Sequence, residues 1–108
     1  MKTLIWLSSS HEDIQRFPEE ARQEAGFELY QVQCGYEPSD WKPILTIGTG
    51  VKEIRLHGRN EHRVMYVAKF AEAVYVLHAF MKKTQQTSKA DIELAKTRFK
   101  QLIAARQR

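Results

Sequence analysis

The sequence contains a single cysteine, Cys34, among 108 residues. One cysteine cannot form an internal disulfide and cannot make a zinc site alone. No stretch approaches the roughly 18 consecutive apolar residues of a membrane span. The apolar run near the N-terminus, residues 4–7, is also shorter than the signal-peptide core of about 7 to 15 residues. These absences predict a cytoplasmic protein with no membrane partner.

Common catalytic and cofactor motifs are missing as well. The chain has no Gly-rich phosphate loop, no HExxH and no CxxC. We therefore expect neither a metal nor a cofactor. The chain is 43% hydrophobic and 28% charged, which suits one soluble domain with a modest core, covering residues 1–108.

Charge is distributed unevenly along the chain. Residues 1–40 contain three basic and eight acidic side chains, and residues 41–79 contain six basic and three acidic ones. Residues 80–108 contain eight basic and two acidic side chains. A basic region of this kind is typical of proteins that bind a polyanion. A solvated helix face without a partner would have the same composition.

The sequence patterns predict a strand, two helices, three or four strands and a final helix. The expected elements are a strand at 3–7, helices between Ser10 and Gly35, strands at 43–48, 51–57, 62–70 and 73–80, and a helix capped by Ser88 and Asp91. Short turns between consecutive strands predict antiparallel pairing, with the helices on one face. The predicted fold class is α+β: a small antiparallel sheet of about four to five strands, two N-terminal helices packed on it and a C-terminal helix.

The segment AVYVLHAF, residues 73–80, is apolar on both faces. This pattern is typical of a strand buried on two sides. We expect its histidine, His78, to be a satisfied core side chain. Lys82 and Lys83 follow after Met81, and we expect both to project from the end of this strand.

A cationic site is predicted on the neighbouring hairpin. In residues 51–57, alternation places Glu53, Arg55 and His57 on one face and Lys52 on the other. Arg63 on the next strand is expected to share the face of Arg55, because opposite residues of an antiparallel pair lie about 5 Å apart. Guanidinium groups match phosphate oxygens in a bidentate manner. The pair would therefore suit a phosphodiester, with Lys82 and Lys83 adding charge.

Each of these residues also has a purely structural interpretation. An arginine on an alternating strand is often solvated or paired with a carboxylate, and Glu53 and Glu61 are available. His57 could be an ordinary surface histidine. From the residues alone, the prediction is a basic α+β domain with a possible phosphate site.

Several stretches of the sequence resemble the RelE/ParE superfamily of bacterial toxins from type II toxin–antitoxin systems. The similarity is to the HigB-like, phage-derived branch and covers almost the whole chain, as a single toxin domain over 1–108. The stretches that carry it are FPEEARQEAGFELYQVQCG, WKPILTIGTGVKEIRL, HRVMYVAKF, VYVLHAFMKKTQQT and SKADIELAKTRF.

The resemblance implies a metal-independent endoribonuclease that cleaves mRNA at the ribosome. The 2′-hydroxyl would attack the adjacent phosphate. A helix-turn-helix antitoxin would be the silencing partner. Arg63 matches the strand arginine taken to hold the scissile phosphate, and Arg55 matches a basic position on the preceding strand. Lys82 and Lys83 match basic positions after the last strand.

The remaining site residues are less directly matched. His57 is a further catalytic candidate, because histidine suits proton transfer near neutral pH. The predicted RNA-binding residues around the site are Lys42, Lys52, Arg59 and Lys89. RelE-type toxins often have a catalytic tyrosine beyond the last strand, and no tyrosine follows Tyr75 here. The general base is therefore left open.

Two other functions fit the same sequence. One is a ParE-like toxin that poisons DNA gyrase and cleaves no RNA. The other is a non-catalytic, phage-derived protein that binds nucleic acid or another protein through its basic C-terminal helix. Fold resemblance alone does not decide between them.

Overall fold

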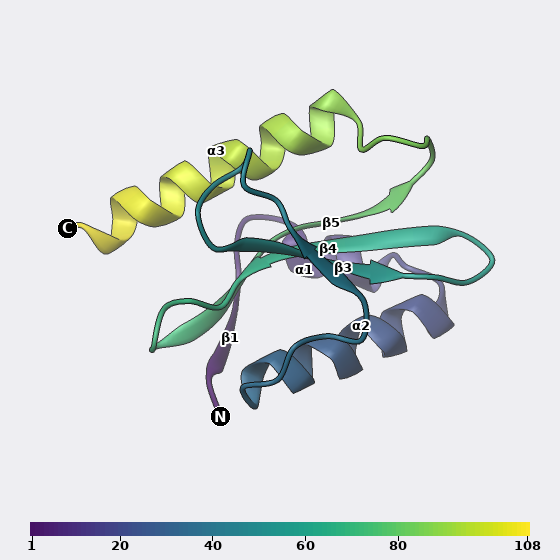
Figure 1. Ribbon diagram of the computed structural model, residues 1–108, viewed down its shortest axis with the longest axis horizontal. Coiled ribbons are helices and arrows are strands. Elements are labelled where there is room, and N and C mark those ends of the chain that lie inside the picture. The colour runs from purple at the N-terminus through teal and green to yellow at the C-terminus, as the bar shows by residue number, and fades with distance from the viewer.

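The computed structural model describes residues 1–108 and contains five strands and three helices. The elements are β1 (Thr3–Trp6), α1 (Ser10–Gln15), α2 (Glu19–Gln33), β2 (Trp41–Pro43), β3 (Val51–Leu56), β4 (Glu61–Val67), β5 (Ala73–Lys82) and α3 (Lys89–Arg106). The strands form one sheet in the order β1-β5-β4-β3-β2 (Figure 1). The predicted α+β class is confirmed, with two N-terminal helices and one C-terminal helix on a five-stranded sheet.

The sheet is mostly antiparallel but not entirely so. Strands β2 to β5 pair antiparallel with their neighbours, as the short turns predicted. β1 pairs with β5 in parallel, with Thr3 opposite Ala73. The chain leaves β1, passes through both N-terminal helices and returns to β1 only at β5, so no short turn in the sequence marks this pairing.

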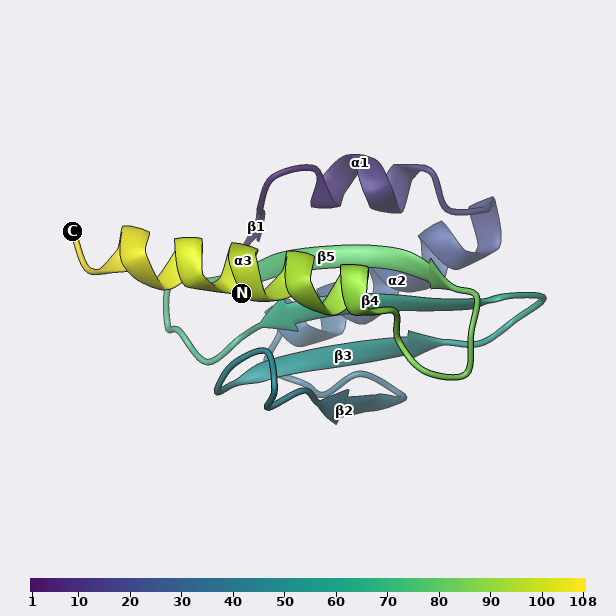
Figure 2. The ribbon, with the colours of Figure 1, turned by 90° about the horizontal axis from the view of Figure 1, so that it is seen from above.

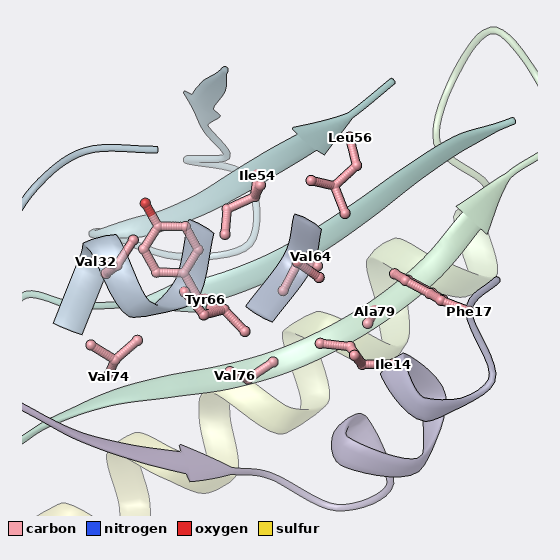
Figure 3. Close-up of a cluster of buried hydrophobic side chains, with 12 residues drawn as sticks. Ile14, Phe17, Val32, Ile54, Leu56, Val64, Tyr66, Val74, Val76 and Ala79 are labelled. Atoms are coloured by element: carbon pink, nitrogen blue, oxygen red, sulfur yellow. The ribbon is translucent and has the colours of Figure 1, made fainter. Parts of the chain in front are cut away.

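The helices cover both faces of the sheet, and the expectation of a single covered face is wrong. α1 and α2 pack on one side, whereas α3 lies on the other (Figures 1 and 2). The strand side chains facing α1 and α2 include Ile54, Leu56, Val64, Tyr66, Val74 and Val76 (Figure 3). Those facing α3 include Val51, Met65, Val67, Tyr75 and Leu77. Because β5 is apolar on both faces, it needs cover on both sides.

The segment predicted as a strand at 43–48 is mostly a turn. β2 ends at Pro43, and residues 44–50 form a loop in which the Ile47 amide donates to the Ile44 carbonyl. Gly50 has φ +86°, a conformation that favours glycine. Ile44 and Ile47 of this loop pack on the core beneath α3, whereas Leu45 is exposed.

The ends of the helices follow their sequence signals. Ser88 caps α3, and its hydroxyl accepts a hydrogen bond from the Asp91 amide, as predicted. α2 begins directly after Pro18, and Gly35 follows its end with φ +94°. None of the three helices is both long and apolar enough to cross a bilayer.

One close approach in the α3 core gives a stability prediction. The ring of Phe99 lies directly against Gly48, so a Cβ at that position would overlap the ring. We expect Gly48→Ala to lower the free energy of unfolding by about 1–3 kcal/mol, the usual cost of overpacking. Urea denaturation measures this change.

Gly26 provides the matched control for that substitution. It is exposed in α2, and a Cβ there would meet no atom within 4 Å. Gly26→Ala should raise the free energy of unfolding by about 0.5–1 kcal/mol, because alanine is the better helix former. Equal effects of the two substitutions would contradict the described packing of Phe99.

Candidate functional site: a cationic cluster on the sheet

Four cations meet on the sheet face that α3 covers only in part. Arg55 and Arg63 are directly opposite each other on β3 and β4, which confirms that they share a face. Lys82 of β5 lies opposite Glu61 of β4. Glu61 is two residues before Arg63 on β4, so Lys82 is close to Arg63. Lys42 of β2 lies opposite Glu53. We call Lys42, Arg55, Arg63 and Lys82 the cationic cluster.

A buried carboxylate, Glu53, lies at the centre of this cluster. It is only 1% exposed. Burial raises its pKa, while the charges of Lys42, Arg63, Arg55 and Lys82 oppose that effect. All four cations therefore act electrostatically on one carboxyl group.

Arg63 is buried and already paired. It is 2% exposed, and one guanidinium nitrogen donates to Glu61 at 3.1 Å and to the His62 carbonyl at 3.0 Å. Its Nε lies 3.7 Å from Glu53. Arg63 is thus paired with carboxylates, which was the structural alternative to phosphate binding. A contact with phosphate remains a prediction, and it would require Glu61 to move.

The cluster also concentrates unsatisfied polar atoms. Buried side-chain atoms without a hydrogen-bond partner include Glu53 Oε2, Arg55 Nε and Arg63 Nε, which are three of the five in the molecule. Such atoms are costly, and native proteins leave few of them. Arg55 Nε and Arg63 Nε are donors that an added anion would satisfy, whereas Glu53 Oε2 is an acceptor that needs a donor.

Lys82 is the member of the cluster best suited to proton transfer. Burial lowers the pKa of its ammonium group, and the charge of Arg63 lowers it further. It is half-buried at the end of β5 and lines a hollow of about 490 Å³. Phe80 and the first turn of α3 form other parts of that hollow. An extended anionic chain could therefore approach Lys82 from solvent.

His57 lies beside the cluster and is held by two carboxylates. Its Nε2 is 2.5 Å from Asp40, and its Nδ1 is 2.8 Å from Glu61. These hydrogen bonds, the one to Asp40 first, raise the pKa of His57. The side chain is 54% exposed. His57 joins the segment before β2 to the β3–β4 hairpin, and both ring nitrogens are occupied.

The His57 contacts predict a pH dependence of stability. The pKa of His57 is higher in the folded than in the unfolded protein. His57 therefore stabilises the fold fully below its unfolded pKa of about 6.5, and this stabilisation is lost as the pH rises through its folded pKa. We expect His57→Gln to flatten this decline, measured by urea unfolding between about pH 6 and about pH 9. An unchanged slope in the variant would show that another group is responsible.

The other predicted RNA-binding residues are dispersed. Lys52 is on the opposite face of the sheet, where it pairs with Glu37 at 3.0 Å and lies 4.5 Å from the ring centroid of Trp41. Arg59 is in the β3–β4 turn. Lys89 is exposed at the start of α3. Lys83, predicted instead as a catalytic residue, is exposed just after β5 and is not part of the cationic cluster. Only Lys42 of this predicted set belongs to the cationic cluster.

His78 is a buried structural residue, as expected. Its Nε2 lies 2.7 Å from Asp91, which ties β5 to the first turn of α3, and its ring stacks on Phe80. Only one of its two ring nitrogens is hydrogen-bonded. Nδ1 is buried without a hydrogen-bond partner and is 3.9 Å from Asp13. No group of three or more His, Cys, Asp or Glu side chains is arranged to hold a metal ion.

Glu53 is the residue that sequence reasoning undervalued. The alternation in VKEIRL places it on the face of Arg55, but alternation alone makes it only one of two available carboxylate partners, with Glu61. The signal that could have singled it out is its place two residues before Arg55, on a strand predicted to lie in the sheet.

Comparison with known proteins assigns the chain to a family. A search of curated proteins found no match. The family model described as "Phage derived protein Gp49-like (DUF891)" matches residues 12–100. This range includes α2, every strand from β2 to β5, the first two thirds of α3 and the whole cationic cluster. The chain therefore belongs to the Gp49-like family of phage-derived proteins.

Proposed function

We propose that this protein is the toxin of a type II toxin–antitoxin system and that it cleaves mRNA at the ribosome without a metal. The observation that carries the proposal is the convergence of Lys42, Arg55, Arg63 and Lys82 around one buried carboxylate. A phosphodiester is the anion that such a group of guanidinium and ammonium donors suits best. The resemblance to HigB-like toxins points to the same chemistry.

The reaction needs charge stabilisation and two proton transfers. The 2′-hydroxyl loses its proton to a base, to which no residue is assigned, and attacks its adjacent phosphorus. The 5′-oxygen leaves with a proton from an acid, and a 2′,3′-cyclic phosphate forms. Arg55 and Lys82 are both half-buried, and in this proposal they stabilise the negative charge that develops on the phosphorane oxygens. Arg63 contributes its field from within the sheet and binds the phosphate directly once Glu61 releases it.

Proton transfer to the leaving oxygen is assigned to Lys82. Its lowered pKa makes the ammonium group a better acid than an ordinary lysine. His57 receives a positioning role, because its two ring nitrogens are bonded to Asp40 and Glu61. Glu53 is likewise a positioning residue that keeps the arginines together.

A toxin of this kind requires a partner that silences it. We propose a helix-turn-helix antitoxin, in keeping with the resemblance. The strongly basic second half of the chain, residues 41–108, supports an approach to ribosomal RNA, since basic surfaces steer proteins toward polyanions.

Controlled expression in bacteria, with 5′-ends of cellular mRNA mapped by primer extension, tests the proposal. New cleavage sites inside translated regions, appearing together with growth arrest, are the expected result. Growth arrest with trapped gyrase–DNA complexes and no new RNA ends would instead assign the protein to the gyrase poisons. Neither arrest nor cleavage would indicate a binding protein.

A further inference from the structure

The outer face of α2 carries an unpartnered aromatic stripe. Phe27, Tyr30 and Tyr36 are 56%, 51% and 65% exposed. Phe27 and Tyr30 are three residues apart on the helix and so share a face. The Tyr36 amide donates to the Gln31 carbonyl, which folds the chain back against the end of α2. Exposed aromatic side chains grouped in this way are typical of protein–protein interfaces.

The same stripe becomes acidic toward the start of the helix. Glu20 and Glu24 precede Phe27 by seven and three residues and are exposed, so they continue its face. Both also line a groove of about 570 Å³ between the first turns of α2 and the β3–β4 turn. Arg59 and His57 also line the groove, but His57 is already paired with Asp40 and Glu61. The three glutamates of the groove, Glu19, Glu20 and Glu24, therefore outnumber its one unpaired cation.

We propose that the α2 face formed by Glu20, Glu24, Phe27, Tyr30 and Tyr36 is the docking surface for an amphipathic, basic helix of a partner protein. Apolar side chains of that helix would cover the aromatic stripe. Lysines or arginines at one of its ends would pair with the glutamates in the groove. Charge complementarity selects this occupant, because an acidic partner or a nucleic acid would be repelled at Glu20 and Glu24.

The position of the surface separates it from the cationic cluster. α2 packs on one side of the sheet and α3 on the other (Figure 1). The strand register places the cationic cluster on the α3 side. The proposed helix would therefore leave the face of Arg55 and Lys82 uncovered. The inference does not depend on RNA cleavage, so it can fail or succeed independently of the proposed function.

The test uses a synthetic, fluorescently labelled peptide with leucines along one helical face and lysines concentrated at one end. Fluorescence anisotropy with the full-length protein gives the Kd. We expect Phe27→Ala combined with Tyr30→Ala to weaken binding about tenfold or more, as for loss of interface anchors. Glu20→Gln combined with Glu24→Gln should also weaken it and reduce its salt dependence.

Control variants change exposed residues outside the α2 face. Leu45→Ala and Glu93→Gln remove an exposed apolar group and an exposed carboxylate elsewhere and should leave the Kd unchanged. A scrambled peptide of identical composition should bind weakly. Equal binding by the α2 variants or by the scrambled peptide would overturn the proposal. So would self-association of the protein that the Phe27 and Tyr30 substitutions abolish, since the occupant would then be a second copy.

Discussion

Replacing Lys82 by methionine is expected to slow RNA cleavage by about 10²- to 10³-fold without unfolding the protein, by analogy with the loss of one oxyanion donor. Methionine keeps much of the length of the side chain but removes the ammonium group that would stabilise the phosphorane and protonate the leaving oxygen. Lys82 is the last residue of β5 and is only half-buried. Single-turnover cleavage on translating ribosomes measures the effect.

Lys100→Met is the matched control for Lys82→Met. Lys100 is exposed on α3 and carries the same charge, but it is not part of the cationic cluster. It should retain cleavage within about twofold, because a distant exposed charge contributes only a screened field. A similar loss in both variants would mean that Lys82 acts through net charge alone and would remove it from the reaction.

The second large effect is on stability. We expect Arg63→Ala to lower the free energy of unfolding by about 3–5 kcal/mol, because it removes the salt-bridge partner of the buried Glu53, leaves only the weaker fields of Lys42, Arg55 and Lys82, and opens a cavity. Both side chains of the pair are buried, with exposed fractions of 3% for Arg63 and 1% for Glu53. Urea unfolding monitored by circular dichroism measures the change.

A double variant distinguishes loss of the Glu53–Arg63 interaction from a general loss of core packing. Replacing Glu53 and Arg63 together by methionine removes both charges and keeps apolar volume, so it should recover most of the stability lost in Arg63→Ala. If the double variant is as unstable as Arg63→Ala, the Glu53–Arg63 interaction is not the cause. Loss of cleavage in a double variant that folds well would support a functional role for the Glu53–Arg63 pair beyond stability.

The cationic face could be predicted from the sequence because of strand alternation. Arg55 and Arg63 lie on strands joined by a short turn, so the register that places them opposite each other follows from the local pattern. The same alternation places Lys52 on the far side of the sheet, where the structure has it. Its prediction as an RNA-binding residue beside Arg55 relied on charge and did not use this geometry.

Other features depend on contacts between distant segments. The parallel pairing of β1 with β5 joins residues about 70 positions apart, and no turn signal marks it. The burial of Arg63 follows from Glu53 and Glu61 surrounding it, whereas the sequence only showed that these carboxylates were available. The placement of α3 opposite α2 follows from the two-sided apolar pattern of β5, which outweighed the expectation of a single helical layer.

The most direct test of the proposed function is the chemistry of the cleaved RNA. Purified protein would be added to ribosomes translating an mRNA, and to a matched mRNA with a single 2′-deoxynucleotide at the mapped cleavage site. The account predicts a 2′,3′-cyclic phosphate on the first RNA, no cleavage at the deoxy position, and loss of the product with Lys82→Met. Cleavage at the deoxy position, or a product unaffected by Lys82→Met, would contradict it.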